Sequence, residues 1–252
     1  MKKITLIHCY SDQNRGDAGI IESTVDLMKE RWPTASFNAV SVFHEDDERF
    51  KNDHYFTKKI VDEIYPAIFY EPSVQRGGRG FTGLKKVLFF FYTLLINLML
   101  LVAPYNWLAK IILSKCRYRT FKAIQESDLV VSKGGSFLYS QGGVAGEFFL
   151  FRMAFAFVLP LRMNKEVLIF SQSLGPFQGV AKYLLFYAIK RMNKVFIREE
   201  ICKKYLPERI AISLETIPDA AFCLKAKEIN LNLTKKKKVA ITARPHKFSS
   251  DP

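Results

Sequence analysis

Short apolar runs alternate with amphipathic stretches over most of the chain. Runs at residues 3–9, 37–43, 129–132, 167–172 and 194–197 have the length and composition of buried strands. Between them, apolar residues recur every three or four positions, which predicts helices over residues 18–31, 146–161 and 180–192. Strands that alternate with helices predict a parallel sheet. We therefore expect an α/β fold, with helices that flank a parallel sheet.

One stretch breaks this alternation because it is almost wholly apolar. Residues 87–103 read VLFFFYTLLINLMLLVA, Pro104 ends the run, and a second apolar piece follows at residues 107–113. We expect an apolar helical hairpin over residues 84–115. Nine basic residues and no acidic one lie between positions 76 and 122, on both sides of the run, so the charge gives no inside–outside asymmetry. We favour a hairpin in the plane of an anionic membrane surface, with a buried core helix and a membrane span as alternatives.

The composition changes near residue 230. Residues 230–238 end in four consecutive lysines, which is typical of a solvated linker, and a new apolar run begins at residue 239. We expect a first domain over residues 1–229, a linker over residues 230–238, and the first strand of a second domain over residues 239–252. A lone strand cannot form a domain, so the pattern predicts that the second domain is truncated and that this chain is incomplete as an enzyme.

Charge and cysteine content narrow the class of partner. The formal net charge is +14, which favours an anionic partner. The basic residues cluster beside apolar ones and not around a DNA- or RNA-reading motif, so we expect no nucleic acid as partner. The four cysteines are far apart and form no C-x-x-C pair. We therefore expect no metal site, no disulfide framework and a cytoplasmic location.

Four polar or glycine-containing loops each follow a predicted strand. In an open α/β sheet, ligands bind at the carboxyl ends of the strands, where glycines let a ligand approach the backbone. Each loop alone has a simpler interpretation: an N-cap for Asp17, a tight turn for the Gly-Gly-Ser segment, a surface ion pair for Arg198. The loops are Asn14/Gly16/Asp17, Gly134/Gly135/Ser136, Gln172/Gly175 and Arg198/Glu199.

The set of loops, taken in order, resembles the polysaccharide pyruvyl transferase family. The matching stretches are NRGD at 14–17, DLVVSKGGS at 128–136, SQSLGPF at 171–177, FIRE at 196–199 and PDAAF at 218–222. The resemblance covers residues 4–244. The sequence departs from the family pattern at Ser136, which replaces a third glycine, and at Lys133, where a small residue is common.

The resemblance implies a GT-B-like architecture of two facing Rossmann-like domains, of which this chain supplies the N-terminal half. It implies phosphoenolpyruvate as donor, with no cofactor, and a sugar hydroxyl pair of a free or lipid-linked surface-polysaccharide precursor as acceptor. Arg198 is our candidate anion clamp and Asp17 our candidate proton acceptor. The remaining candidate substrate-binding residues are Asn14, Gly16, Gly134, Gly135, Ser136, Gln172, Gly175, Asp219 and Arg244.

Two other functions fit the same sequence. A nucleotide-sugar glycosyltransferase can use the same architecture. A non-catalytic fragment associated with a membrane is the second alternative. For the enzyme, we expect a cytoplasmic protein that associates peripherally with the inner face of the cell membrane.

Overall fold

A computed structural model of the protein describes residues 1–69, 84–140 and 142–225. These residues form one eight-stranded sheet in which every paired strand is parallel to its neighbour. The strand order is β3-β2-β1-β4-β6-β7-β8, and β5 pairs with β6 beside this path. The strands are β1 (Lys3–Cys9), β2 (Ser36–Ser41), β3 (Glu63–Tyr65), β4 (Leu129–Ser132), β5 (Gly135–Ser140), β6 (Glu166–Phe177), β7 (Lys194–Ile197) and β8 (Glu215–Thr216).

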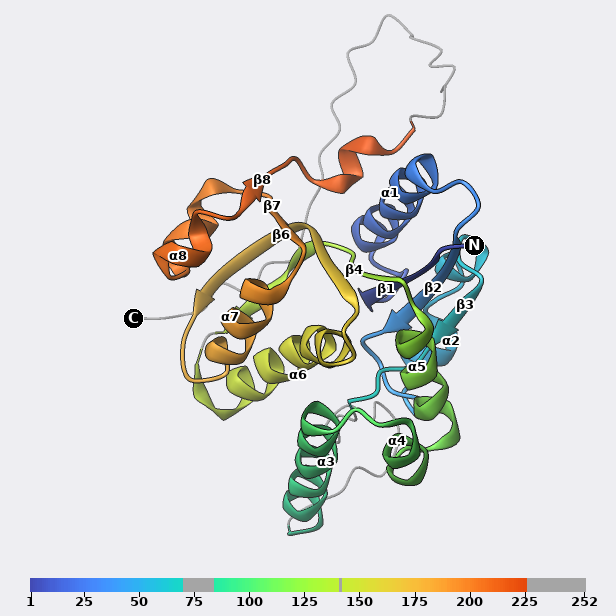
Figure 1. The fold of residues 1–252 in the computed structure, drawn as a ribbon, viewed down its shortest axis with the longest axis vertical. Coiled ribbons are helices and arrows are strands. Elements are labelled where there is room, and N and C mark those ends of the chain that lie inside the picture. The colour runs from blue at the N-terminus through green and yellow to red at the C-terminus, as the bar shows by residue number, and fades with distance from the viewer. Residues whose placement is uncertain (70–83, 141, 226–252) are drawn as a thin grey trace, which may run out of the picture.

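Helices cover both faces of this sheet (Figure 1). On one face, α1 packs its apolar side on β1, β2 and β4. On the other face, α5, α6 and α7 bury the larger core. The helical elements are α1 (Arg15–Arg31), α2 (Glu48–Asn52), η1 (Thr57–Lys59), α3 (Leu84–Val102), α4 (Asn106–Ile112), α5 (Lys115–Glu126), α6 (Gly143–Arg162), α7 (Lys182–Arg191), η2 (Glu200–Tyr205), α8 (Glu208–Ala211) and η3 (Ala220–Cys223).

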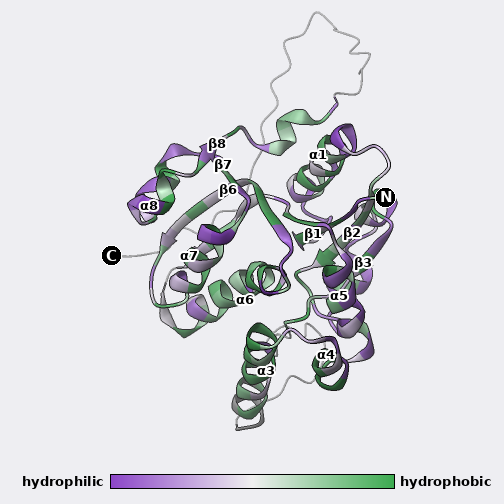
Figure 2. Cartoon of the chain, in the orientation of Figure 1, coloured by the Kyte–Doolittle hydropathy of each residue, from purple (hydrophilic) through white to green (hydrophobic). Residues whose placement is uncertain are grey.

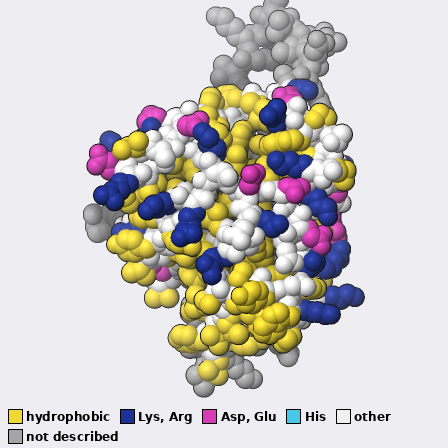
Figure 3. All heavy atoms as spheres, viewed as in Figure 1, with side chains coloured by type: hydrophobic (Ala, Val, Ile, Leu, Met, Phe, Trp, Pro, Cys, Tyr) yellow, Lys and Arg dark blue, Asp and Glu magenta, His cyan; other side chains and the backbone are white. Residues whose placement is uncertain are grey.

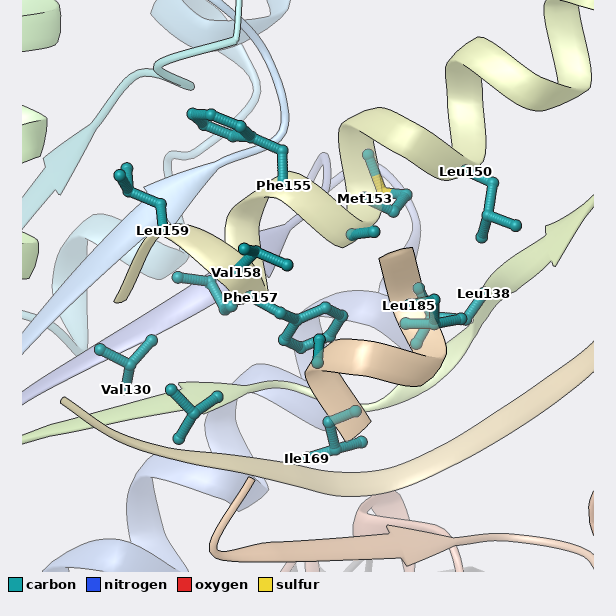
Figure 4. Packing of buried hydrophobic residues seen from close by; sticks show 14 of the residues in the cluster. Val130, Leu138, Leu150, Met153, Phe155, Phe157, Val158, Leu159, Ile169 and Leu185 are labelled. Atoms are coloured by element: carbon teal, nitrogen blue, oxygen red, sulfur yellow. The ribbon is translucent and has the colours of Figure 1, made fainter. Parts of the chain in front are cut away.

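Helix α6 lies at the centre of the larger core. Its buried residues, among them Phe157 and Leu159, pack on Val130 of β4 and Ile169 of β6 (Figure 4). By length and composition, α6 is the one described helix that could cross a membrane, but 44% of its most apolar window is buried inside the protein. Its apolar character is therefore explained by the core it fills.

The predicted hairpin is present as α3 and α4. Both helices project from the edge of the molecule and are coloured as strongly hydrophobic (Figure 2). α3 buries only part of its surface, including Ile96 and Leu100, and it packs mainly on α6. The alternative of a buried core helix therefore does not describe α3, which is only partly buried.

The predicted sheet is confirmed, with three corrections. The strand predicted over residues 37–43 is β2, which spans Ser36–Ser41. The Gly-Gly-Ser segment is not a simple turn, since Gly135 opens the extra strand β5. The strand predicted over residues 167–172 continues to Phe177, because β5 pairs with its second half. The predicted linker 230–238, the strand 239–252 and Arg244 lie outside the described residues.

Candidate functional site

The strand order reverses between β1 and β4. The chain leaves β1 toward β2 on one side, and it leaves β4 toward β6 on the other. At such a switch point the two connections part and leave a crevice at the carboxyl ends of the strands, where doubly wound proteins bind their ligands. Asp17 follows β1 and Lys133 follows β4, so these two residues lie at the switch point.

Lys133 is the functional candidate that the sequence analysis missed. Its side chain is fully buried, and its Nζ donates a hydrogen bond to Asp17 Oδ1. The ammonium also lies 5.4 Å from the ring centre of Tyr10 and 5.8 Å from that of Phe137. A buried ammonium is stable only when it is paired. Lys133 therefore needs the Asp17 carboxylate.

A second donor fixes the other oxygen of Asp17. Asn14 caps α1, because its Oδ1 accepts from the backbone N–H of Gly16 at 3.1 Å. Its Nδ2 donates to Asp17 Oδ2 at 2.6 Å. The carboxylate is thus held from both sides, by an amide on its own helix and by an ammonium from β4. Asp17 is not the N-cap itself, contrary to the simpler interpretation, and 19% of its side chain remains exposed.

The two glycines after β4 serve the packing of strands. At Gly134, with φ +69°, an added Cβ would lie 2.1 Å from the carbonyl oxygen of Phe170 on β6. Gly135 also has a positive φ, of +127°, which favours glycine. Ser136 is exposed on β5. The close approach we expected from a ligand is therefore made, at Gly134, by the backbone of β6.

A line of contacts leads from this loop to Arg198. Gly134 abuts Ser171, and Ser171 Oγ donates to the carbonyl oxygen of Pro218 at 2.8 Å. The next residue, Asp219, forms an ion pair with Arg198 and also accepts from the N–H of Ala221 at the start of η3. Asp219 caps η3, and η3 packs on α1, the helix that contains Asp17. Asp219 and Asp17 therefore lie on the same side of the sheet.

Arg198 is therefore neither free nor a simple surface residue. Its guanidinium is paired with Asp219, lies 4.0 Å from Glu199 and keeps 25% of its side chain exposed. An arginine with one carboxylate partner retains further N–H donors. It can thus still bind an anion that enters from solvent.

Gln172 and Gly175 both lie on β6. Gln172 is fully buried, its Nε2 donates to the carbonyl oxygen of Ser173, and its Oε1 accepts no hydrogen bond from the described residues. Such an oxygen can accept from a ligand hydroxyl. At Gly175, an added Cβ would lie 2.6 Å from the ring of Tyr205, so packing explains this glycine.

Other reactive groups near the site are suppressed by burial. Burial lowers the pKa of His8 to about 3, although its ring hydrogen bonds to Met153 and lies near Ser132. Burial likewise raises the pKa of Cys9 to about 12 and raises the pKa of Cys202. Among residues 1–69, 84–140 and 142–225, no group of three acidic, histidine or cysteine side chains could hold a metal ion. Among the described candidate residues, the titratable groups that keep some exposure are those of the two ion pairs, Asp17 at 19% and Arg198 and Asp219 at 25% and 15%.

The chain matches one known family. The family described as polysaccharide pyruvyl transferase matches residues 14–251, a range that includes every candidate residue above. None of the curated proteins compared with the chain matches it. The match spans nearly the whole chain, and the chain therefore belongs to the polysaccharide pyruvyl transferase family and is a transferase.

Proposed function

We propose that the protein transfers a pyruvyl group from phosphoenolpyruvate to two hydroxyls of a sugar in a surface-polysaccharide precursor. In this reaction the donor's methylene carbon gains one proton and becomes a methyl group. Two sugar oxygens bond to C2, and the C–O bond to phosphate breaks. The hydroxyls release two protons, one of which balances the methyl group and the other the departing phosphate. The products are a pyruvate ketal and inorganic phosphate.

The observation that carries this proposal is the pair of cation–carboxylate contacts that follow the sheet strands, Lys133–Asp17 at the switch point and Arg198–Asp219 after β7, within a chain of this family. The donor carries a carboxylate and a phosphate, so it needs a partly exposed cation with a planar fork of donors. Arg198 meets this requirement. Asp17 is our proton acceptor for a sugar hydroxyl. Lys133 is too deeply buried to touch a substrate, so it acts by orienting the Asp17 carboxylate.

We infer that the acceptor is presented at the cytoplasmic face of a membrane, with the protein bound peripherally. The support is the exposed apolar face of α3. Its inward side carries the buried polar residues Thr93 and Asn97, while Phe91 and Leu95 face outward and are 60% and 58% exposed. Figure 3 shows hydrophobic side chains gathered where α3 and α4 lie. An exposed apolar face of this kind favours a lipid surface.

The test of the proposed reaction is donor choice. The purified protein is incubated with a glycan acceptor and either phosphoenolpyruvate or a nucleotide sugar, and the release of phosphate or nucleotide is measured. We expect acceptor-dependent phosphate release from phosphoenolpyruvate only. Release of nucleotide, with no phosphate from phosphoenolpyruvate, would favour a glycosyltransferase instead.

A further inference from the structure

An apolar groove lies between α3, α6 and α7. It has a volume of about 780 Å³, within the range of ligand-binding clefts. Leu94 and Leu98 of α3 form one wall, and Phe148 and Phe151 of α6 face them. No lysine or arginine is among the described residues that line it.

The groove begins just beyond the ends of β5 and β6. Ser140 at the end of β5 pairs in register with Phe177 at the end of β6. The residues that follow these two strands, Gly142 and Gln178, line the groove. The groove therefore lies beyond two strands that carry candidate residues, Ser136 on β5 and Gln172 on β6.

The groove is also continuous with the exposed apolar face of α3. Leu98 belongs to both, since it lines the groove and is partly exposed on α3. On the opposite wall, Val144 and Val180 line the groove and are 82% and 74% exposed. Together with Leu98 they extend the apolar groove into an exposed apolar patch, a feature that marks binding surfaces. Their exposure is explained if an apolar ligand covers them.

We propose that this groove holds the hydrocarbon chain of a lipid carrier to which the acceptor sugar is attached. This inference rests on the proposed function and adds a binding site for the lipid part of its acceptor. The walls fit a chain and not its headgroup, because they offer no cation for a phosphate. Their one carboxylate, Glu147, accepts through Oε2 from the N–H groups of Val180 and Ala181 at 2.7 Å each, and its Oε1 is buried without a hydrogen-bond partner among the described residues.

The geometry gives the chain a path from membrane to site. The outward face of α3 rests on lipid, the groove receives the chain beside it, and the sugar at the end of the chain lies toward the ends of β5 and β6. A bound chain would therefore raise the affinity for a lipid-linked acceptor and leave donor binding unchanged.

The first experiment measures binding without turnover. Hexyl, octyl and decyl monophosphates, each below its micelle concentration, are titrated into the full chain by calorimetry. Burial of each CH₂ raises affinity about fourfold, so we expect one saturable site per chain, with octyl bound about 16-fold more tightly than hexyl. In a competition experiment, a polyprenyl monophosphate is bound to the protein, and excess bilayer phospholipid should displace it only weakly. Equal competition would mean that the groove takes ordinary membrane lipid, and no dependence on chain length would refute the groove as a binding site.

A matched pair of variants locates the site. Val144→Glu/Val180→Glu changes two exposed groove residues, and Ile111→Glu changes an exposed apolar residue of α4 outside the groove. We expect the groove variant to lose alkyl phosphate binding at least tenfold, and the α4 variant to keep it within twofold. Equal losses in both variants would show non-specific adsorption. A dimer that only the groove variant abolishes would mean that a second copy of the chain occupies the groove.

Turnover then separates this inference from the proposed reaction. The groove variant should raise KM for a lipid-linked acceptor about tenfold, with kcat and the KM for phosphoenolpyruvate unchanged, and it should use a lipid-free acceptor as the wild type does. If the wild type binds no chain but still forms ketals, only the groove inference fails. If it binds the chain but forms no ketal, only the reaction fails.

Discussion

Asp17 and Lys133 form an unequal ion pair, and this inequality predicts which single substitution is more destabilising. The Lys133 ammonium is fully buried, whereas part of the Asp17 carboxylate is exposed and also bound by Asn14. Asp17→Ala leaves a buried charge unpaired, which lowers the free energy of unfolding by about 3–5 kcal/mol. Lys133→Met leaves a carboxylate that keeps water and Asn14 as partners, so we expect a loss of only about 1 kcal/mol.

Urea unfolding of the two single variants and of the double variant measures this difference. Thermal unfolding gives a second readout. For a chain of this size, each kcal/mol lost from the free energy of unfolding lowers the Tm by about 2–4 °C, so the Tm of Asp17→Ala should fall by about 6–20 °C. The double variant should be nearly as stable as Lys133→Met, because removal of the ammonium removes the unpaired charge. If Asp17→Ala proves no more destabilising than Lys133→Met, or the double variant shows the sum of both losses, the pair does not stabilise the site as we describe.

Three further predictions concern pH, the donor and the membrane. Between pH 6.5 and about 3, His8 binds a proton in the unfolded chain but not in the folded protein, because burial lowers its pKa. As the pH is lowered through this window, the free energy of unfolding should fall by about 1.4 kcal/mol per pH unit. The urea midpoint of His8→Asn should depend less on pH than that of the wild type. Arg198→Lys should lower kcat/KM for phosphoenolpyruvate roughly 100-fold, whereas the exposed control Arg209→Lys should not. Leu95→Ser should weaken sedimentation with anionic vesicles at low salt, and equal weakening by the exposed, distant Ile212→Ser would contradict the α3 face.

The sequence pattern predicts most of the sheet because buried parallel strands are continuous apolar runs. Three predicted strands, including residues 129–132, have the bounds that the structure shows. The strands that were missed are short or start with glycine. β3 has three residues and β8 has two, too few for a periodicity. β5 opens with a glycine that favours a turn locally, and only its pairing with β6 makes it a strand.

The candidate site was predicted in location but not in its contacts. The rule that ligands bind at strand ends placed Asp17, Gly134 and Arg198 at one edge of the sheet. It could not show that Lys133 turns inward, since a lysine in a loop is ordinarily solvated. The available signal was a lysine directly after a buried strand, in place of the small residue of the family. The pairing of Arg198 with Asp219 depends on the return of η3 to α1, which no local pattern encodes.

The transfer of an isotopic label tests the central claim most directly. Phosphoenolpyruvate labelled with ¹³C at C2 is incubated with the protein and a lipid-linked glycan, and the glycan is examined by NMR. We expect a labelled quaternary ketal carbon in the glycan, one phosphate released per ketal, and loss of both signals in Arg198→Lys. Phosphate release without label in the glycan, or a labelled glycan with equal yield from Arg198→Lys, would contradict pyruvyl transfer at this site.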